Sequence, residues 1–135
     1  MTGREPDVGD NQVPFPRSVP AMTSPLLPKL TLESVRIRAV SVPLKRPIVA
    51  RVGEYRKWPF ILIDVHTKEG IVGRSYLEPY IEKSCRYLSQ TISDLADTLV
   101  GKPLAPLDAY RDGMRSLHLV GREGVTLIAI SGLDM

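Results

Sequence analysis

The stretch FILIDVHTKEGIVGRSYL, residues 60–77, decides the fold. Its first part, from Phe60 to Thr67, sends its side chains alternately to two faces and places only β-branched residues on one of them. That period of two is expected of a half-buried β-strand. Residues 68–70 form a short turn, in which Gly70 can take a positive φ angle. The chain then returns as a second strand from Ile71 to Leu77, so the stretch predicts a β-hairpin.

A further strand is predicted upstream of this hairpin. Residues 35–39 alternate in the same way, with aliphatic side chains on one face and two arginines on the other. Pro43 and Pro47 are predicted to end the strand, because proline cannot donate to a ladder of backbone hydrogen bonds. Residues 44–58 show no clean period, and we interpret them as a long loop. A loop of this length in a small domain is typically functional.

Three helices are predicted after the sheet. Apolar residues recur at steps of four and three from Ile81 to Leu99, and Pro79 suits the first turn of that helix. Asp108 is expected to cap a second helix that ends at Gly121. Residues 124–135 (GVTLIAISGLDM) are apolar in nearly every direction, which is typical of a helix buried all round. The fold class is therefore α+β, with a three-stranded antiparallel sheet followed by a bundle of about three helices.

The composition is that of one globular domain. The chain has 135 residues, of which 43% are hydrophobic and 24% charged. Six of its 12 prolines lie in residues 1–30, where aliphatic residues are few. We therefore predict a disordered, proline-rich tail at 1–30 and a folded domain at 31–135. Either Met1 or Met22 can be the true start.

Charge and cysteine content exclude several classes of function. The net charge of +3 is too small and too evenly spread to predict nucleic-acid binding. The charge is locally uneven, since residues 36–57 contain seven basic residues and a single acid, Glu54. One cysteine excludes an internal disulfide framework and a cysteine-rich metal site. No stretch reaches the length of a membrane span, and the N-terminus lacks the apolar core of a signal peptide. We expect a cytoplasmic protein without a membrane partner.

The last predicted helix indicates a missing partner. A helix that closes a small domain is expected to show a polar face and a stop signal, but this one reaches Leu133, Asp134 and Met135 still in apolar register. We therefore expect the domain to be truncated in its last helix. The absent cover is either a second domain of the same protein or another subunit.

Five motifs in this order resemble the N-terminal capping domain of the enolase superfamily, in its mandelate racemase and muconate lactonizing enzyme branch. Together they span about 100 of the 135 residues. They are VRIRAVSVPL at 35–44, ILIDV at 61–65, GRSYL at 73–77, GKPLAP at 101–106 and AISGLDM at 129–135.

The resemblance implies a division of labour between two domains. In that family the capping domain covers the mouth of a (β/α)-barrel, and the barrel carries the acid, base and metal groups. The complete enzyme is then a Mg²⁺-dependent racemase or dehydratase that removes the proton next to a carboxylate. This chain lacks the barrel motifs, so we expect it to supply no catalytic residue, to bind no metal and to be inactive alone. The complete enzyme is expected to be a homo-oligomer.

The resemblance also implies which residues cover the substrate. Ile48, Val52 and Tyr55 lie in the loop that folds over it, and Tyr80 lies in a second covering segment. The loop RVGEYRKW, residues 51–58, is bulkier and more charged than the small apolar lid of mandelate racemase. The resemblance therefore implies a small carboxylic acid as substrate, either a hydroxy acid or a sugar acid, without deciding between them.

The cations of this loop have two interpretations. Arg51, Arg56 or Lys57 could contact an anionic substrate, or all three could point into water. The substrate, and the choice between racemisation and dehydration, stay open.

The remaining reactive side chains do not form a site in the sequence. His66 and His118 have no supporting cysteine or carboxylate spacing for a metal. Cys85 lies on the apolar stripe of the first helix, where a buried thiol packs rather than reacts. The alternative to the capping function is a stand-alone, non-catalytic α+β module for binding or interaction.

Overall fold

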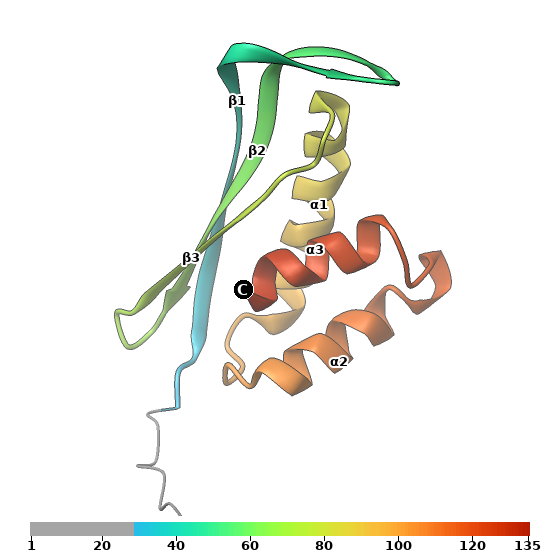
Figure 1. Cartoon of the computed structure of the whole chain (residues 1–135). Coiled ribbons are helices and arrows are strands. Elements are labelled where there is room, and N and C mark those ends of the chain that lie inside the picture. Colours follow the sequence, from blue (N-terminus) through green and yellow to red (C-terminus); the bar gives the residue numbers. More distant parts are fainter. Residues whose placement is uncertain (1–28) are drawn as a thin grey trace, which may run out of the picture.

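Three antiparallel strands and three α-helices make up the part of the chain that the computed structural model describes, residues 29–135. The sheet has the order β1-β2-β3, with β1 (Leu32–Ala50), β2 (Gly53–Thr67) and β3 (Val72–Leu77). The helices are α1 (Glu82–Leu99), α2 (Pro106–Ser116) and α3 (Val125–Asp134), with a short 3₁₀ turn at His118–Val120. All three helices lie on one side of the sheet (Figure 1). The predicted α+β fold is confirmed, while the predicted tail falls outside the described residues except for Lys29 and Leu30.

The predicted hairpin of residues 60–77 is confirmed. Strands β2 and β3 pair in antiparallel register, with Ile63 opposite Ser75. Gly70 takes a φ of +82°, and the turn is closed by a hydrogen bond from the Thr67 N–H to the Ile71 carbonyl. Because β2 also pairs with β1, it is the central strand of the sheet.

The predicted loop at residues 44–58 is wrong, because β1 and β2 continue as a paired ribbon up to a turn at residues 51–52. The pairing skips between Pro43 and Ile48, so residues 44–47 form a bulge that accommodates Pro47. Prolines are tolerated here because β1 is an edge strand. Figure 1 shows this tip bending over the end of α1 at which the helix begins. Both of its faces are largely exposed, so no alternation of apolar residues marks it in the sequence.

The core lies between the sheet and the helices. Ile61 and Ile63 of β2 are fully buried, as is Ile92 of α1. Each such side chain stabilises the fold by about 1.5–3 kcal/mol. The predicted stripe is confirmed as the buried face of α1 for Cys85, Leu88, Ile92, Leu95 and Leu99. Its first predicted member, Ile81, precedes the helix and is 46% exposed.

Two predicted helix starts are wrong by a few residues. Helix α1 begins at Glu82 rather than near Pro79, since Tyr80 has a positive φ that a helix cannot contain. Helix α2 begins at Pro106 after Ala105, and Asp108 lies in its first turn without capping it. Proline suits the first turn of a helix, because its missing N–H would have no partner inside the helix.

Helix α3 is buried on one face only, so the expectation of a helix buried all round is wrong for this structure. Thr126, Ala129 and Ile130 face the core. Val125 and Leu127 are 39% and 44% exposed. A helix of this composition therefore leaves an apolar surface, which is the kind of surface that another protein segment covers.

Gly132 allows α3 to approach the sheet closely. A Cβ atom at this position would lie 2.8 Å from Cδ1 of both Ile63 and Leu77. The Ser75 hydroxyl also donates a hydrogen bond to the Gly132 carbonyl, which ties β3 to the same turn of the helix. The fit of α3 on the sheet thus depends on the missing side chain.

A carboxylate fixes the start of β1. The Oε2 atom of Glu69 accepts a hydrogen bond of 2.9 Å from the backbone N–H of Thr31. This hydrogen bond lowers the pKa of Glu69. The turn between β2 and β3 is thereby linked to the residue that precedes β1.

We predict that Gly132→Ala destabilises the protein and that Gly132→Val does so further. Overpacking costs about 1–3 kcal/mol, while alanine regains about 1 kcal/mol of helix propensity over glycine. Urea unfolding measures the net loss. The control is Ser131→Ala at the exposed neighbouring position, where we expect little change. An alanine variant more stable than the parent would contradict the close fit.

We predict that Glu69→Gln makes the free energy of unfolding less dependent on pH below neutrality. A carboxyl whose pKa is lowered by folding stabilises the protein above its unfolded pKa of about 4.3, and this contribution is lost as the pH falls through the folded value. Unfolding free energies between pH 7 and pH 3 should therefore fall more steeply for the parent than for the variant. Parallel profiles would show that the hydrogen bond to Thr31 does not form in solution.

We predict that the chain self-associates through the exposed side of α3 and that Leu127→Lys reduces this association. A charge on an apolar surface opposes its burial in a contact between copies. Sedimentation velocity measures the change in association. The matched control is Leu119→Lys, because Leu119 is 97% exposed but lies in the 3₁₀ turn. Equal effects of the two substitutions would assign the association to general hydrophobicity instead.

Candidate functional site

The two tyrosines predicted to cover a substrate both contact Trp58. The ring centroids of Tyr55 and Trp58 are 5.8 Å apart, and those of Trp58 and Tyr80 are 6.3 Å apart. The interplanar angles are 82° and 88°, so both contacts are edge-to-face, an arrangement that aromatic quadrupoles favour. We call Tyr55, Trp58 and Tyr80 the aromatic cluster. It joins β2 to the connection between β3 and α1.

A hydrogen bond reinforces this junction. The indole Nε1–H of Trp58 donates to Oε2 of Glu78, with a distance of 3.1 Å. Glu78 is the residue that follows β3. A carboxylate acceptor makes such a bond stronger than one between neutral groups. Nearby, the hydroxyl of Ser41 on β1 donates to Oε1 of Glu82 over 2.6 Å, which ties the start of α1 to the sheet.

Tyr80 is held in an unusual backbone conformation. Its φ angle is +64°, and in the described residues no other non-glycine residue has a positive φ. The Ile81 N–H donates to the Pro79 carbonyl over 2.7 Å, which closes a three-residue γ-turn around Tyr80. The form with positive φ is rare and strained, and such strain concentrates at functional positions. The turn projects the tyrosine ring outward, and the residue is 65% exposed.

The other two predicted residues lie at the end of the β1–β2 ribbon, residues 48–58, which we call the hairpin tip. Ile48 is the direct cross-strand partner of Tyr55 and is 42% exposed. Val52 lies in the turn at the end of the ribbon and is 82% exposed. The structure thus brings Ile48, Tyr55 and Tyr80 to the same end of the domain. It places Val52 as an exposed turn residue without a role in the cluster.

Trp58 was missed at the level of the sequence. In a regular strand, residues 55 and 58 lie on opposite faces, so no periodic pattern predicts their contact. The bulge at residues 44–47 bends and twists the ribbon opposite them. The available signal was compositional, since Trp58 is the single tryptophan of the chain and stands inside the segment singled out as functional.

The hairpin tip that carries Tyr55 and Trp58 also carries three cations, Arg51, Arg56 and Lys57. Arg56 pairs with Glu54 of the same strand over 2.7 Å, so one of the three predicted anion contacts is already occupied. Arg51 and Lys57 are exposed and make no ion pair in the part of the chain that the structure describes. The tip is therefore cationic, with three basic residues and one acid.

The histidines and the cysteine lie outside this region. His66 is half-buried on β2, and His118 accepts a hydrogen bond of 3.1 Å at Nδ1 from the Arg122 Nε–H. Burial raises the pKa of the Cys85 thiol, which disfavours the nucleophilic thiolate. Residues 29–135 contain no group of three or more His, Cys, Asp or Glu residues arranged to hold a metal ion.

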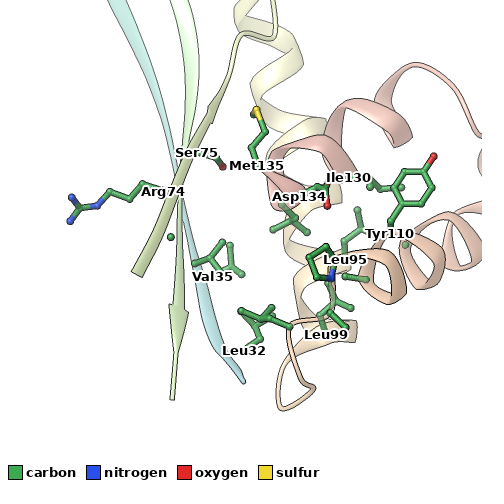
Figure 2. Close-up of a pocket in the computed structure, with 18 residues that line it drawn as sticks. Leu32, Val35, Arg74, Ser75, Leu95, Leu99, Tyr110, Ile130, Asp134 and Met135 are labelled. Carbon is green, nitrogen blue, oxygen red and sulfur yellow. The ribbon is translucent and has the colours of Figure 1, made fainter. Parts of the chain in front are cut away.

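An apolar cavity of about 200 Å³ lies elsewhere in the fold, between the sheet and helices α2 and α3. Figure 2 shows Leu32 and Val35 of β1 facing Leu95 and Ile130 across it. Arg74 borders the cavity with its main chain, while its side chain extends away from it (Figure 2). None of the four predicted substrate residues lines this cavity, so it is separate from the hairpin tip.

Between residues 29 and 135, no helix is both long enough and apolar enough to span a membrane. The longest helix, α1, has an exposed polar side along its whole length.

Comparison with a family model identifies most of the chain. Residues 32–135 match the N-terminal domain of the mandelate racemase / muconate lactonizing enzyme family. A solved structure of an enolase from the alpha-proteobacterium BAL199 with bound Mg is 46% identical in sequence and has a TM-score of 0.76. The similarity covers 78% of this chain and 29% of that one.

Two further solved structures show the same relation. An enolase from Bradyrhizobium, complexed with magnesium and mandelic acid, is 34% identical, with a TM-score of 0.73 over 81% of this chain and 30% of that one. A racemase from Streptomyces coelicolor A3(2) with bound magnesium shares the fold at 21% identity and a TM-score of 0.70, over 76% of this chain and 29% of that one. The chain thus spans about 30% of the length of the structures it resembles.

Proposed function

We propose, from the premise that this chain belongs to the mandelate racemase / muconate lactonizing enzyme family, that it is the substrate-covering and specificity domain of a Mg²⁺-dependent racemase or dehydratase. The observation that carries the proposal is the clustering of Tyr55 and Tyr80 on Trp58 at one end of the domain. This end is formed by a strand ribbon that extends past the core. Its position suits a surface that closes over a neighbouring site.

In this proposal the chain contributes no group that reacts. Mg²⁺ bound in the rest of the enzyme would stabilise the negative charge that develops when a proton leaves the carbon next to a carboxylate. The described residues do not offer a carboxylate set for that ion. The role of this chain is to exclude water, which strengthens the electrostatic interactions at the covered site.

The aromatic cluster and its cations point to the class of substrate. An exposed aromatic surface suits contact with the apolar part of an organic acid, while Arg51 and Lys57 suit a further anionic or hydroxylated part. Mandelic acid in the Bradyrhizobium relative is an example of a 2-hydroxy acid held by such an enzyme. We therefore propose a hydroxy acid or a sugar acid as substrate.

The remaining partners follow from the same assignment. We propose that a C-terminal (β/α)-barrel domain packs on this one and covers the exposed apolar side of α3. We also propose a homo-oligomeric enzyme in the cytoplasm, a reducing compartment that suits a chain with one free cysteine.

A chimera tests the proposed function. Residues 29–135 replace the N-terminal domain of the Bradyrhizobium relative, and exchange of the α-proton is followed by ¹H NMR in D₂O with Mg²⁺. The substrate is the hydroxy acid or sugar acid on which the intact relative exchanges fastest. We expect the chimera to exceed the isolated barrel by at least about a hundredfold, because sequestration and positioning supply that much. We expect no exchange by the chain alone. A chimera that folds and binds Mg²⁺ but exchanges no faster than the isolated barrel would favour a non-catalytic binding module.

We predict that Tyr55→Ala and Tyr80→Ala each lower kcat/KM of the chimera by a factor of about two to about ten, since an aromatic contact is worth about 0.5–1.5 kcal/mol and each 1.36 kcal/mol is a factor of ten in rate. The matched control is Tyr87→Ala, because Tyr87 is a partly exposed tyrosine on α1 outside the cluster. Equal losses in all three variants would refute a specific role for the hairpin tip.

A further inference from the structure

Two segments that are distant in the sequence meet at Trp58. One is the hairpin tip, residues 48–58, which carries Ile48 and Tyr55. The other is the connection between β3 and α1, residues 78–81, which carries Tyr80. The ring of Trp58 contacts both Tyr55 and Tyr80, and its indole N–H donates a hydrogen bond to Glu78. A single side chain therefore contacts both of the segments assigned to substrate covering.

Neither of the two segments is firmly held without Trp58. Tyr80 lies in a strained γ-turn, and its side chain is mostly exposed. A strained turn persists only when surrounding contacts over-determine it. The tip is a two-stranded ribbon exposed on both faces, and such ribbons are marginally stable by themselves. Both segments therefore need an additional tie, and the Trp58–Glu78 bond supplies one.

We infer that Trp58 is a positioning residue that couples the hairpin tip to residues 78–81, so that the two segments cover the substrate as one unit. The inference rests on the proposed function for its catalytic consequence, but the coupling itself is a property of the chain alone. Breaking the Trp58–Glu78 bond should loosen the tip and the γ-turn together. The hydrogen bond and the edge-to-face contacts of Trp58 can be tested separately, because phenylalanine at this position keeps an aromatic ring but has no N–H to donate.

Hydrogen exchange of the full chain, residues 1–135, tests the coupling. In Trp58→Phe and in Glu78→Ala we expect the amides of residues 48–58 and of residues 78–81 to exchange about fivefold faster, the factor that corresponds to one hydrogen bond of about 1 kcal/mol. Glu78→Gln should restore slow exchange in both segments, because the amide oxygen still accepts from the indole. Asp112→Ala removes an exposed acid on α2 instead and should leave both segments unchanged.

Tryptophan fluorescence gives a second measurement on the variants of Glu78 and Asp112, all of which keep Trp58. Trp58 is the single tryptophan, so acrylamide quenching reports on this side chain alone. We expect quenching to increase in Glu78→Ala and to stay near the parent value in Glu78→Gln and Asp112→Ala. The exchange of α1 amides checks the fold, since Ile92 and its neighbours belong to the core.

Three outcomes would overturn the coupling. The first is faster exchange in the tip with no change at residues 78–81, which would show two independent segments. The second is an equal acceleration throughout α1, which would assign Trp58 to global stability. The third is a failure of glutamine to substitute for Glu78.

The chimera separates this inference from the proposed function. If the segments are coupled, Trp58→Phe should raise KM about threefold with a smaller change in kcat, because a hydrogen bond that orders the cover acts on binding. Glu78→Gln should keep the parent KM. Coupled exchange in the chain together with an inactive chimera would refute the proposed function and leave the coupling intact. An active chimera whose two segments exchange independently would refute the coupling and leave the proposed function intact.

Discussion

The register of β2 against both of its neighbours is the constraint on which the rest of the structure depends. Ile61 and Ile63 face the helices because β2 alternates its side chains, and a shift by one residue would turn them outward. The same strand continues beyond the core and carries Tyr55 and Trp58. The core and the candidate site are therefore carried by one continuous strand, although the bulge in β1 separates the pairing of the tip from that of the core.

The sequence predicted those elements in which one face is buried. The α1 stripe from Cys85 to Leu99 and the hairpin around Gly70 were correct, since burial on one side imposes a periodic choice of residues. The paired ribbon at residues 44–58 was predicted as a loop, because exposed strands need no such pattern and Pro43 and Pro47 look like strand breakers. An edge strand with a bulge accepts both prolines, and its position at the edge is a property of the tertiary fold.

The candidate site, too, could be predicted from the sequence only in part. The resemblance to a family placed Ile48, Tyr55 and Tyr80 in two covering segments, and the structure brings them to one end of the domain. The contacts of Trp58 depend on the local twist of the ribbon and on the turn around Tyr80, neither of which leaves a pattern in the sequence. Residues that hold a site together across two segments are found only when the backbone is known, whereas the segments themselves can be recognised by motif.

The prolines of β1 have a consequence for the behaviour of the protein at high concentration. A long strand at the border of a sheet offers unpaired backbone groups on which another chain can add a strand, and this is a common start of fibrillar aggregates. In β1 the bulge interrupts the regular ladder, Pro43 and Pro47 have no N–H to offer, and Lys45 and Arg46 add charge between them. These features reduce the pairing capacity of the edge where the ribbon extends beyond the helices, and so they oppose the addition of a strand from another copy of the chain.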